Sequence, residues 1–447
     1  MLILAQIFGM RNFLLSFLFI ISGTFFLQAQ TGENYAYLKK YILSQPKLKI
    51  DSSNFLSIYH NKELHYLYPI YKSITQEDRL IANSNETQYL IDLSEALSFS
   101  GDYLSALEIE KKSYDKKLED SIYKGLSKQQ DLFAGVEFKD AKKYILEKVK
   151  NQKVVMLNES HNKPLHRAFT ASLLEELYTM GFRYLAMETL NQFSNASLKQ
   201  VNILTGHYTC EPIAGELARK AINLGFTLVA YEDSSNQHSI NQREYTQAEN
   251  IHKIIQKDPS AKILVLAGDK HIEEGATSDD RIPMAAYFKI ISGIDPFTID
   301  QTSLTEQSTS EYGSAIYDYY SKKNAFTTPV VLLKNNHPKD IFDLNLCDVY
   351  ILHPPTKYRN GRPSWTSMNG LKKETAVQPI YQALFFVQAF YDKEYSEKQL
   401  GKLVPADQTY ITAADGYYYL YLQKGRYQIA YHDMQYKLLG TKVLMVE

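Results

Sequence analysis

The feature that most constrains the fold is a central series of short apolar runs separated by segments of helical length. Four such runs are VVML (154–157), RYLAM (183–187), FTLVAY (226–231) and KILVLAG (262–268). Pro164 and Gly181 mark the expected beginning and end of the first intervening helix. Runs that are apolar throughout are typical of strands covered on both faces, so the pattern predicts an α/β fold with a mainly parallel sheet flanked by helices.

The regions on either side of this core have a different character. Residues 30–140 read as helical, and YLIDLSEALSFSGDYLSALEIEKKSY (89–114) has the spacing of one tetratricopeptide-like helical hairpin. A single hairpin cannot form a solenoid, so we expect a helical cap. Further strands are predicted in an α/β domain that spans 141–375, at residues 296–300, 329–333 and 348–352.

Residues 376–447 are predicted to form a small β-sandwich-like module. We expect an apolar helix at 380–391, followed by a hairpin of tyrosine-rich strands whose loop carries Gly425. Exposed tyrosines of this module, or the N-terminal helices, are candidate surfaces for a protein partner, although strand packing also explains the tyrosines.

The N-terminus predicts a secretory signal peptide over residues 1–29. Arg11 supplies the positive charge, residues 13–21 the apolar stretch, and Ala29 the small residue at a cleavage site. The alternative is an uncleaved N-terminal anchor, because residues 1–9 are also apolar. No later stretch is long and apolar enough for an integral span, so we expect export to the periplasm or the extracellular space.

Charge and cysteine content narrow the possible partners. The net charge is −1, from 49 Lys and Arg against 50 Asp and Glu, which argues against nucleic acid as the main partner. A small molecule or a peptide is the expected substrate. Cys210 and Cys347 are too few for a disulfide framework, and the sequence leaves open whether they pair.

Titratable side chains follow each of the four central runs directly. They are Glu159 and His161, then Glu188, then Glu232, and finally Asp269 and His271. Because the carboxyl ends of parallel strands meet at one edge of a sheet, we expect these side chains to share a site. A solvated loop would explain any one of them, but not the succession.

Two arginines are placed to join this edge. Arg167 and Arg243 lie in the first turns of predicted helices that begin there. A guanidinium group at this position would hold the carboxylates ionised and could stabilise an oxyanion, although an ordinary salt bridge is equally consistent with the pattern. His207 and His238 lie in nearby loops and read as surface histidines, with ligand roles as the alternative.

Two chemistries suit these residues. In the first, His161 is a general base for water, oriented by Glu188 or Glu159, and His271 or an arginine stabilises the developing negative oxygen. In the second, a divalent metal (Zn²⁺, Mn²⁺ or Fe²⁺) is held by a mixed set of candidates, Glu159, His161, Glu188 and His271. Neither Gly-x-Ser-x-Gly nor His-Glu-x-x-His occurs, which argues against a serine-hydrolase elbow and a zincin helix.

Two stretches resemble a known superfamily. NESHNKPLHRAF…LLEELYTMGFRYLAMETL looks like the Gly-Glu-x-His opening of the erythromycin esterase-like and ChaN-like (haem-uptake) proteins, which are similar in pattern to TraB and Tiki-type proteins. INQREYTQAENIHKIIQKDPSAKILVLAGDKHI looks like their later signature. The match covers roughly residues 150–300, and Asn158 stands where the family usually has Gly.

The resemblance implies a hydrolytic or ligand-binding pocket. Its catalytic residues would be Glu159, His161, Glu188, Arg243 and His271, and Arg167, Glu232 and Asp269 are the candidates for substrate binding. We therefore expect an exported hydrolase of an ester or amide, with metal assistance left open. The alternatives are a non-catalytic haem- or iron-binding uptake protein and an inert-pocket interaction scaffold.

Overall fold

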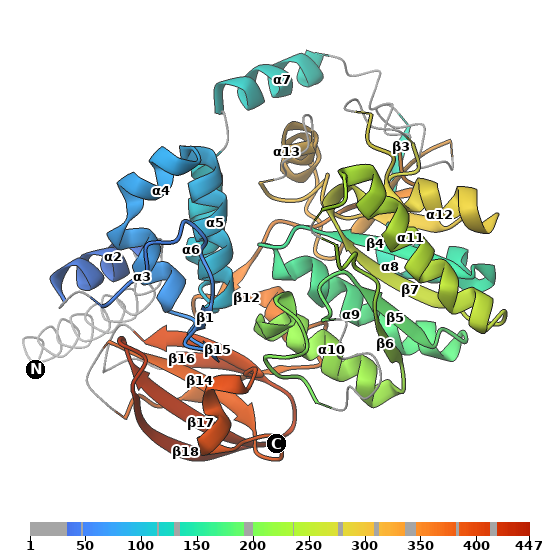
Figure 1. Cartoon of the computed structure of the whole chain (residues 1–447). Coiled ribbons are helices and arrows are strands. Elements are labelled where there is room, and N and C mark those ends of the chain that lie inside the picture. The colour runs from blue at the N-terminus through green and yellow to red at the C-terminus, as the bar shows by residue number, and fades with distance from the viewer. Residues whose placement is uncertain are drawn as a thin grey trace, which may run out of the picture.

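The computed structural model describes most of the chain (Figure 1). The described ranges are 34–45, 48–113, 116–128, 135–191, 200–235, 237–275, 280–307, 313–335, 346–380, 384–411 and 418–447. The expected signal peptide, residues 1–29, lies outside these ranges. Within them, every helix is too short or too polar to cross a bilayer.

An eight-stranded sheet, with strand order β3-β9-β10-β8-β4-β7-β5-β6, forms the centre of the chain. Its strands are β3 (Val136–Asp140), β4 (Val154–Glu159), β5 (Tyr184–Met187), β6 (Thr227–Ala230), β7 (Ile263–Gly268), β8 (Phe297–Asp300), β9 (Val330–Lys334) and β10 (Val349–Leu352). The strands from β10 to β6 run parallel; at one edge β9 pairs antiparallel with β10, and β3 pairs antiparallel with β9. The predicted fold class is confirmed, but β3 joins the sheet although the α/β domain was expected to begin at residue 141.

Helices cover both faces of the sheet (Figure 1). One face carries α8 (Ala141–Lys148), α9 (Pro164–Thr179) and α10 (Pro212–Leu224), and the other α11 (Ile240–Lys257), α12 (Met284–Ser292) and α13 (Gly313–Lys323). Alternate residues of β4 supply the two cores, with Val155 and Leu157 on the α9 side and Val154 and Met156 on the α11 side. By the same alternation, the side chain of Glu159 is directed toward α9.

The strand order decides which strand tips meet. β7 lies between β4 and β5, with Glu159 paired with Gly268 and Met187 paired with Leu266. The segments that leave β4, β7 and β5 therefore emerge side by side at the carboxyl edge, although β7 is the last of the three along the chain.

The N-terminal region is helical, as expected. It contains α2 (Asn34–Ser44), α3 (Tyr68–Thr75), α4 (Glu77–Asn83), α5 (Glu86–Phe99), α6 (Tyr103–Lys112) and α7 (Lys116–Lys128). The helix pair predicted over 89–114 is present as α5 and α6. Asn85 and Asp102 cap these helices by accepting hydrogen bonds from the backbone N–H groups of Gln88 and Ser105.

The C-terminal module contains two antiparallel sheets that share an apolar core. One pairs β13 (Lys373–Val377) with β16 (Tyr418–Leu422), and the other has the order β15 (Asp407–Ile411), β14 (Phe385–Tyr391), β17 (Gly425–Asp433) and β18 (Leu438–Val446). Two details of the prediction are wrong. The apolar stretch expected as a helix is strand β14, buried on both faces, and the tyrosine-rich strands β16 and β17 belong to different sheets instead of forming a hairpin.

The two cysteines are both free and buried. Cys210 packs in the core on the α9 face of the sheet and Cys347 in the core on the α11 face, so the two thiols do not pair. Burial raises the pKa of Cys210 to about 12, which keeps its sulfur protonated and unreactive at neutral pH.

Candidate active site

A pocket of about 680 Å³ opens at the carboxyl edge of the sheet. Seven of the residues singled out in the sequence line it: His161, Glu188, His207, Glu232, Arg243, Asp269 and His271. Glu159 lies beneath the pocket, in contact with His161. The expected convergence of the strand tips is therefore present.

His161 and Glu159 form a hydrogen-bonded pair. Nδ1 of His161 lies 3.1 Å from Oε1 of Glu159, whose side chain is only 4% exposed. The imidazole ring is stacked on Tyr208 with ring centroids 4.0 Å apart, which fixes the ring plane. Because Nδ1 is engaged with the carboxylate, Nε2 is the nitrogen left to face the pocket.

Arg167 holds Glu159 in place. Its Nε and Nη2 donate to the two carboxylate oxygens of Glu159 at 2.9 and 2.8 Å, a bidentate ion pair. Nη1 of Arg167 donates to Glu211 at 3.2 Å, and the hydroxyl of Tyr103, from α6, donates to the other oxygen of Glu211 at 2.9 Å. Arg167 is 1% exposed, so the expectation that it binds substrate is wrong, and it acts as a positioning residue.

Charge balance sets the protonation of the pair. Burial raises the pKa of Glu159, but Arg167 and His161 lower that pKa by a larger amount, so the net shift is downward. Burial lowers the pKa of His161, whereas Glu159 and then Glu188 raise it, and the net shift is upward. Glu159 is therefore ionised at neutral pH, and His161 is a stronger base than a free imidazole.

A second network surrounds Glu188, which β5 directs toward α11. Arg243, from the first turn of α11, donates through Nη2 to Glu188 at 2.8 Å and through Nε to Glu232 at 3.0 Å. Burial raises the pKa of Glu188, but His271, His161 and Arg243 lower it well below its usual value. The Glu188 carboxylate is thus ionised and held by a fixed cation.

His271 completes this network as a cation. Its Nδ1 lies 2.8 Å from Glu244 and its Nε2 3.5 Å from Glu188. Burial lowers the pKa of His271, but the two carboxylates raise it more, to about 9. His271 is consequently an imidazolium at neutral pH, so it can stabilise negative charge but cannot serve as the base.

Gly268 keeps the space between the two networks open. A Cβ atom built on it would lie 2.9 Å from Oε2 of Glu188 and 3.0 Å from Nε2 of His161. The backbone of Gly268 has φ −72° and ψ 151°, which any residue adopts, so close approach is the only demand for glycine here. Nε2 of His161 and Oε2 of Glu188 therefore lie close together above the α-carbon of Gly268.

The site does not fit a resident divalent metal. Both oxygens of Glu159 are engaged by Arg167, Oε1 of Glu188 by Arg243, and Nδ1 of His271 by Glu244. Within the described ranges, no three His, Cys, Asp or Glu side chains are grouped to hold an ion. The guanidinium groups occupy the positions at which a cation would meet the carboxylates.

The lining of the pocket also does not suit haem. A porphyrin needs a broad apolar slot, whereas this lining consists of charged and polar side chains apart from Tyr208 and Gly268. His207 lies on the rim, 3.7 Å from Glu95 of α5, and His238 is an exposed residue paired with Asp233.

Sequence reasoning missed four residues of the site: Tyr208, Glu211, Glu244 and Arg281. Arg281 and His271 both contact Glu244, and the pKa of Glu244 is lowered although burial raises it. None of the four follows a strand directly, so the strand-end pattern could not find them. Glu244 could have been noticed as the residue next to Arg243.

In the loop 353–365, the basic residues Lys357 and Arg359 are exposed, whereas Arg362 is buried. Arg362 is 4% exposed, and its guanidinium pairs with Asp407 of β15 and donates to the backbone of Gly101 at 2.7 Å. Arg362 therefore ties the loop to both the helical region and the β module.

No protein-family model and no curated protein matches the chain. Among solved structures it is similar to the C-terminal region of Pasteurella multocida toxin, described as having a thiol-protease-like catalytic triad, with 13% identity and a TM-score of 0.29 over 53% of this chain and 35% of that one. It is also similar to RRSP, an effector domain of a MARTX toxin from Vibrio vulnificus, with 14% identity and a TM-score of 0.27 over 61% and 63%. The chain spans about a third of the first toxin chain and less than two thirds of the second, and at these TM-scores no activity is transferred.

Proposed function

We propose that the chain is an exported hydrolase of an ester or amide in which His161 is the general base. One observation carries the proposal. Nδ1 of His161 lies 3.1 Å from a buried, ionised Glu159, while Nε2 faces the pocket beside Glu188. A base oriented by a fixed carboxylate is the arrangement that general-base catalysis requires.

The hydrolysis divides into two proton transfers. Nε2 of His161 takes a proton from a water molecule, whose oxygen adds to the carbonyl carbon of the substrate, and Glu188 accepts a hydrogen bond from the same water. The imidazolium then returns the proton to the leaving alcohol or amine as its bond to the carbonyl carbon breaks, and the acid is released. Glu159 stabilises the imidazolium between these steps.

Positive charge for the developing oxyanion comes from the second network. Arg243, whose side chain is one third exposed, and His271 line the same pocket as His161. Both cations are fixed by carboxylates before substrate arrives, so little reorganisation is needed during the reaction. The pocket volume suits a small molecule or one or two residues of a peptide.

A substrate panel tests the proposal. Purified protein is assayed on p-nitrophenyl esters and fluorogenic peptides, beside His161→Ala and the control His238→Ala, which removes an exposed imidazole. We expect hydrolysis by the wild type and the control and a loss of roughly 10²–10⁴-fold in His161→Ala. Wild-type rates in His161→Ala would refute the assignment, and a Soret band on haem titration without any hydrolysis would favour haem binding.

Export is part of the proposal and rests on the N-terminal sequence alone. Expression of the full chain, followed by N-terminal sequencing of the protein outside the cytoplasm, tests it. A mature N-terminus close after Ala29 is expected, and a chain that keeps Met1 in the membrane fraction would support the anchor.

A further inference from the structure

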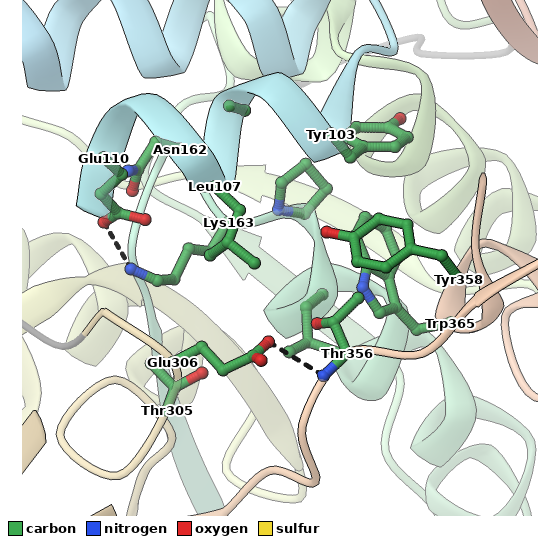
Figure 2. A pocket seen from close by; sticks show the side chains of 13 residues that line it. Tyr103, Leu107, Glu110, Asn162, Lys163, Thr305, Glu306, Thr356, Tyr358 and Trp365 are labelled. Carbon is green, nitrogen blue, oxygen red and sulfur yellow. Dashed lines mark hydrogen bonds and ion pairs between the residues drawn. The ribbon is translucent and has the colours of Figure 1, made fainter. Parts of the chain in front are cut away.

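A second cavity lies beside the site, where the helical region meets the α/β domain (Figure 2). It holds about 40 Å³ of free space, enough for a head group of a few atoms but not for a sugar ring. Its walls come from α6, the beginning of α9, and the loops around residues 305–306 and 356–365. Asn162 and Lys163, the two residues after His161, form part of the wall.

The cavity contains hydrogen-bonding capacity that the described residues leave unused. Thr305 is 1% exposed, and within the described ranges its hydroxyl has no hydrogen-bond partner. Burying a hydroxyl without a hydrogen-bond partner is unfavourable, and a bound donor or acceptor would remove that penalty.

Glu306 adds a carboxylate that lacks a close counter-ion. It accepts hydrogen bonds from Thr356, including one from the backbone N–H at 3.0 Å, and within the described part of the chain it forms no ion pair, although the more distant Lys163 lowers its pKa. Burial is the main reason that the pKa of Glu306 is raised, which is the response of a carboxylate short of positive charge.

Among the described residues that line the cavity, the one cation is Lys163, and it is already engaged. Nζ of Lys163 donates to Glu110 and, at 2.7 Å, to the carbonyl oxygen of Gln307. Lys163 and Glu110 therefore form an ion pair, and Glu306 adds a negative charge to the described lining.

Aromatic rings form the remaining wall. Tyr358 and Trp365 both line the cavity, and Trp365 packs against Tyr103 with ring centroids 4.9 Å apart. Figure 2 shows the Glu306 carboxylate and the Tyr358 hydroxyl directed toward the same space beside the stem of Lys163. Aromatic surfaces next to a carboxylate are suited to an organic cation.

We propose that this cavity binds the ammonium head of an organic amine, with Glu306 as the counter-ion and Thr305 and Tyr358 as hydrogen-bond partners. The small volume selects a primary ammonium group over a bulkier cation. The chemistry is shared by a free alkylamine and by a lysine side chain of a peptide.

The only tryptophan of the chain, Trp365, reports on the cavity directly. We expect n-butylammonium chloride to change tryptophan fluorescence of the full chain in a saturable manner, and neutral n-butanol to do so at least tenfold more weakly. Glu306→Gln keeps the shape and an acceptor for Thr356, and should weaken n-butylammonium binding roughly tenfold or more, the value of about one charge-assisted hydrogen bond.

Controls separate the cavity from general effects. Glu249→Gln, which removes an exposed carboxylate on α11, should bind n-butylammonium as the wild type does. A saturable response to Nα-acetyl-lysine-methylamide that is tighter than that to n-butylammonium would indicate a peptide as the source, and a weaker one a free amine. An equal response to n-butanol, an unchanged affinity in Glu306→Gln, or no saturable response would overturn the proposal. Hydrolysis does not enter these readouts, so they stand apart from the proposed function.

Discussion

The charged state of His271 can be tested by its effect on stability. In the folded chain, Glu188 and Glu244 raise the pKa of His271 from 6.5 to about 9 although burial lowers it. A group whose pKa is raised by folding stabilises the protein fully below its unfolded pKa, and that contribution is lost as the pH rises through the folded pKa. The contribution of His271 should therefore disappear between about pH 6.5 and pH 9.

The size of the effect follows from the shift. One pKa unit corresponds to about 1.4 kcal/mol, so protonated His271 contributes about 3 kcal/mol to the free energy of unfolding at pH 6. His271→Gln retains a donor of similar reach but no charge. The wild type should be about 3 kcal/mol more stable than the variant at pH 6, apart from any packing difference, and this advantage should vanish by pH 10.

Urea unfolding followed by circular dichroism at several pH values measures this difference. Because the free energies of unfolding of the wild type and His271→Gln are subtracted, the contributions of other groups that titrate in the same pH range cancel. His252→Gln, in which the replaced imidazole lies on α11 without an ion pair in the described ranges, is the control and should follow the wild-type curve. Parallel curves for wild type and His271→Gln between pH 6 and pH 10 would refute the reasoning, because they would show that His271 is not charged by its carboxylates.

Three further predictions concern the reaction. Glu159→Gln should lower kcat roughly 10²–10⁴-fold and destabilise the fold by about 3 kcal/mol, because Arg167 loses its main partner. It should also move the rising limb of the pH–rate profile to lower pH, because Glu159 no longer raises the pKa of His161. A limb that stays in place would contradict the pairing of Glu159 with His161. Gly268→Ala should fold normally, since the φ angle of Gly268 is accessible to alanine. Its kcat should nevertheless fall about 10²-fold, because the new methyl group displaces His161 or Glu188. The control Gly125→Ala, at an exposed position of α7, should keep full activity. Prolonged treatment with EDTA should leave the rate unchanged, and a rate restored only by added Zn²⁺, Mn²⁺ or Fe²⁺ would contradict the assignment of the cationic positions to arginine.

The strands of the sheet could be predicted because a buried strand appears in the sequence as a continuous run of apolar residues. Runs such as VVML and KILVLAG are apolar throughout, which is typical of a strand covered on both faces, and β4 and β7 are found where these runs predict them. The same local rule failed at Phe385–Tyr391, because a short apolar run can belong to a buried helix or a buried strand. Pairing in the β module failed for a different reason: a two-residue connection fits a hairpin, but here it leads from one sheet to the other.

The membership of the candidate site was predictable from the sequence, and the roles of its residues were predictable in part. Parallel strands place their carboxyl ends at one edge, which was sufficient to bring His161, Glu188 and His271 together. The position of β7 between β4 and β5 depends on contacts between segments far apart in the chain, and the spacing of the apolar runs does not reveal it. For the same reason the sequence could not show that Arg167 is buried against Glu159, or that arginines occupy the positions at which a metal ion would meet the carboxylates.

The central claim, that His161 supplies the base through Nε2, is tested most directly by chemical rescue. His161→Gly removes the ring and leaves a space against Tyr208 into which free imidazole can diffuse. The account predicts that this variant hydrolyses the best ester of the panel at least about 10²-fold more slowly than the wild type, and that added imidazole restores part of the rate with a dependence on its unprotonated form. Undiminished hydrolysis by His161→Gly, or a loss that imidazole does not relieve while the fold is intact, would contradict it.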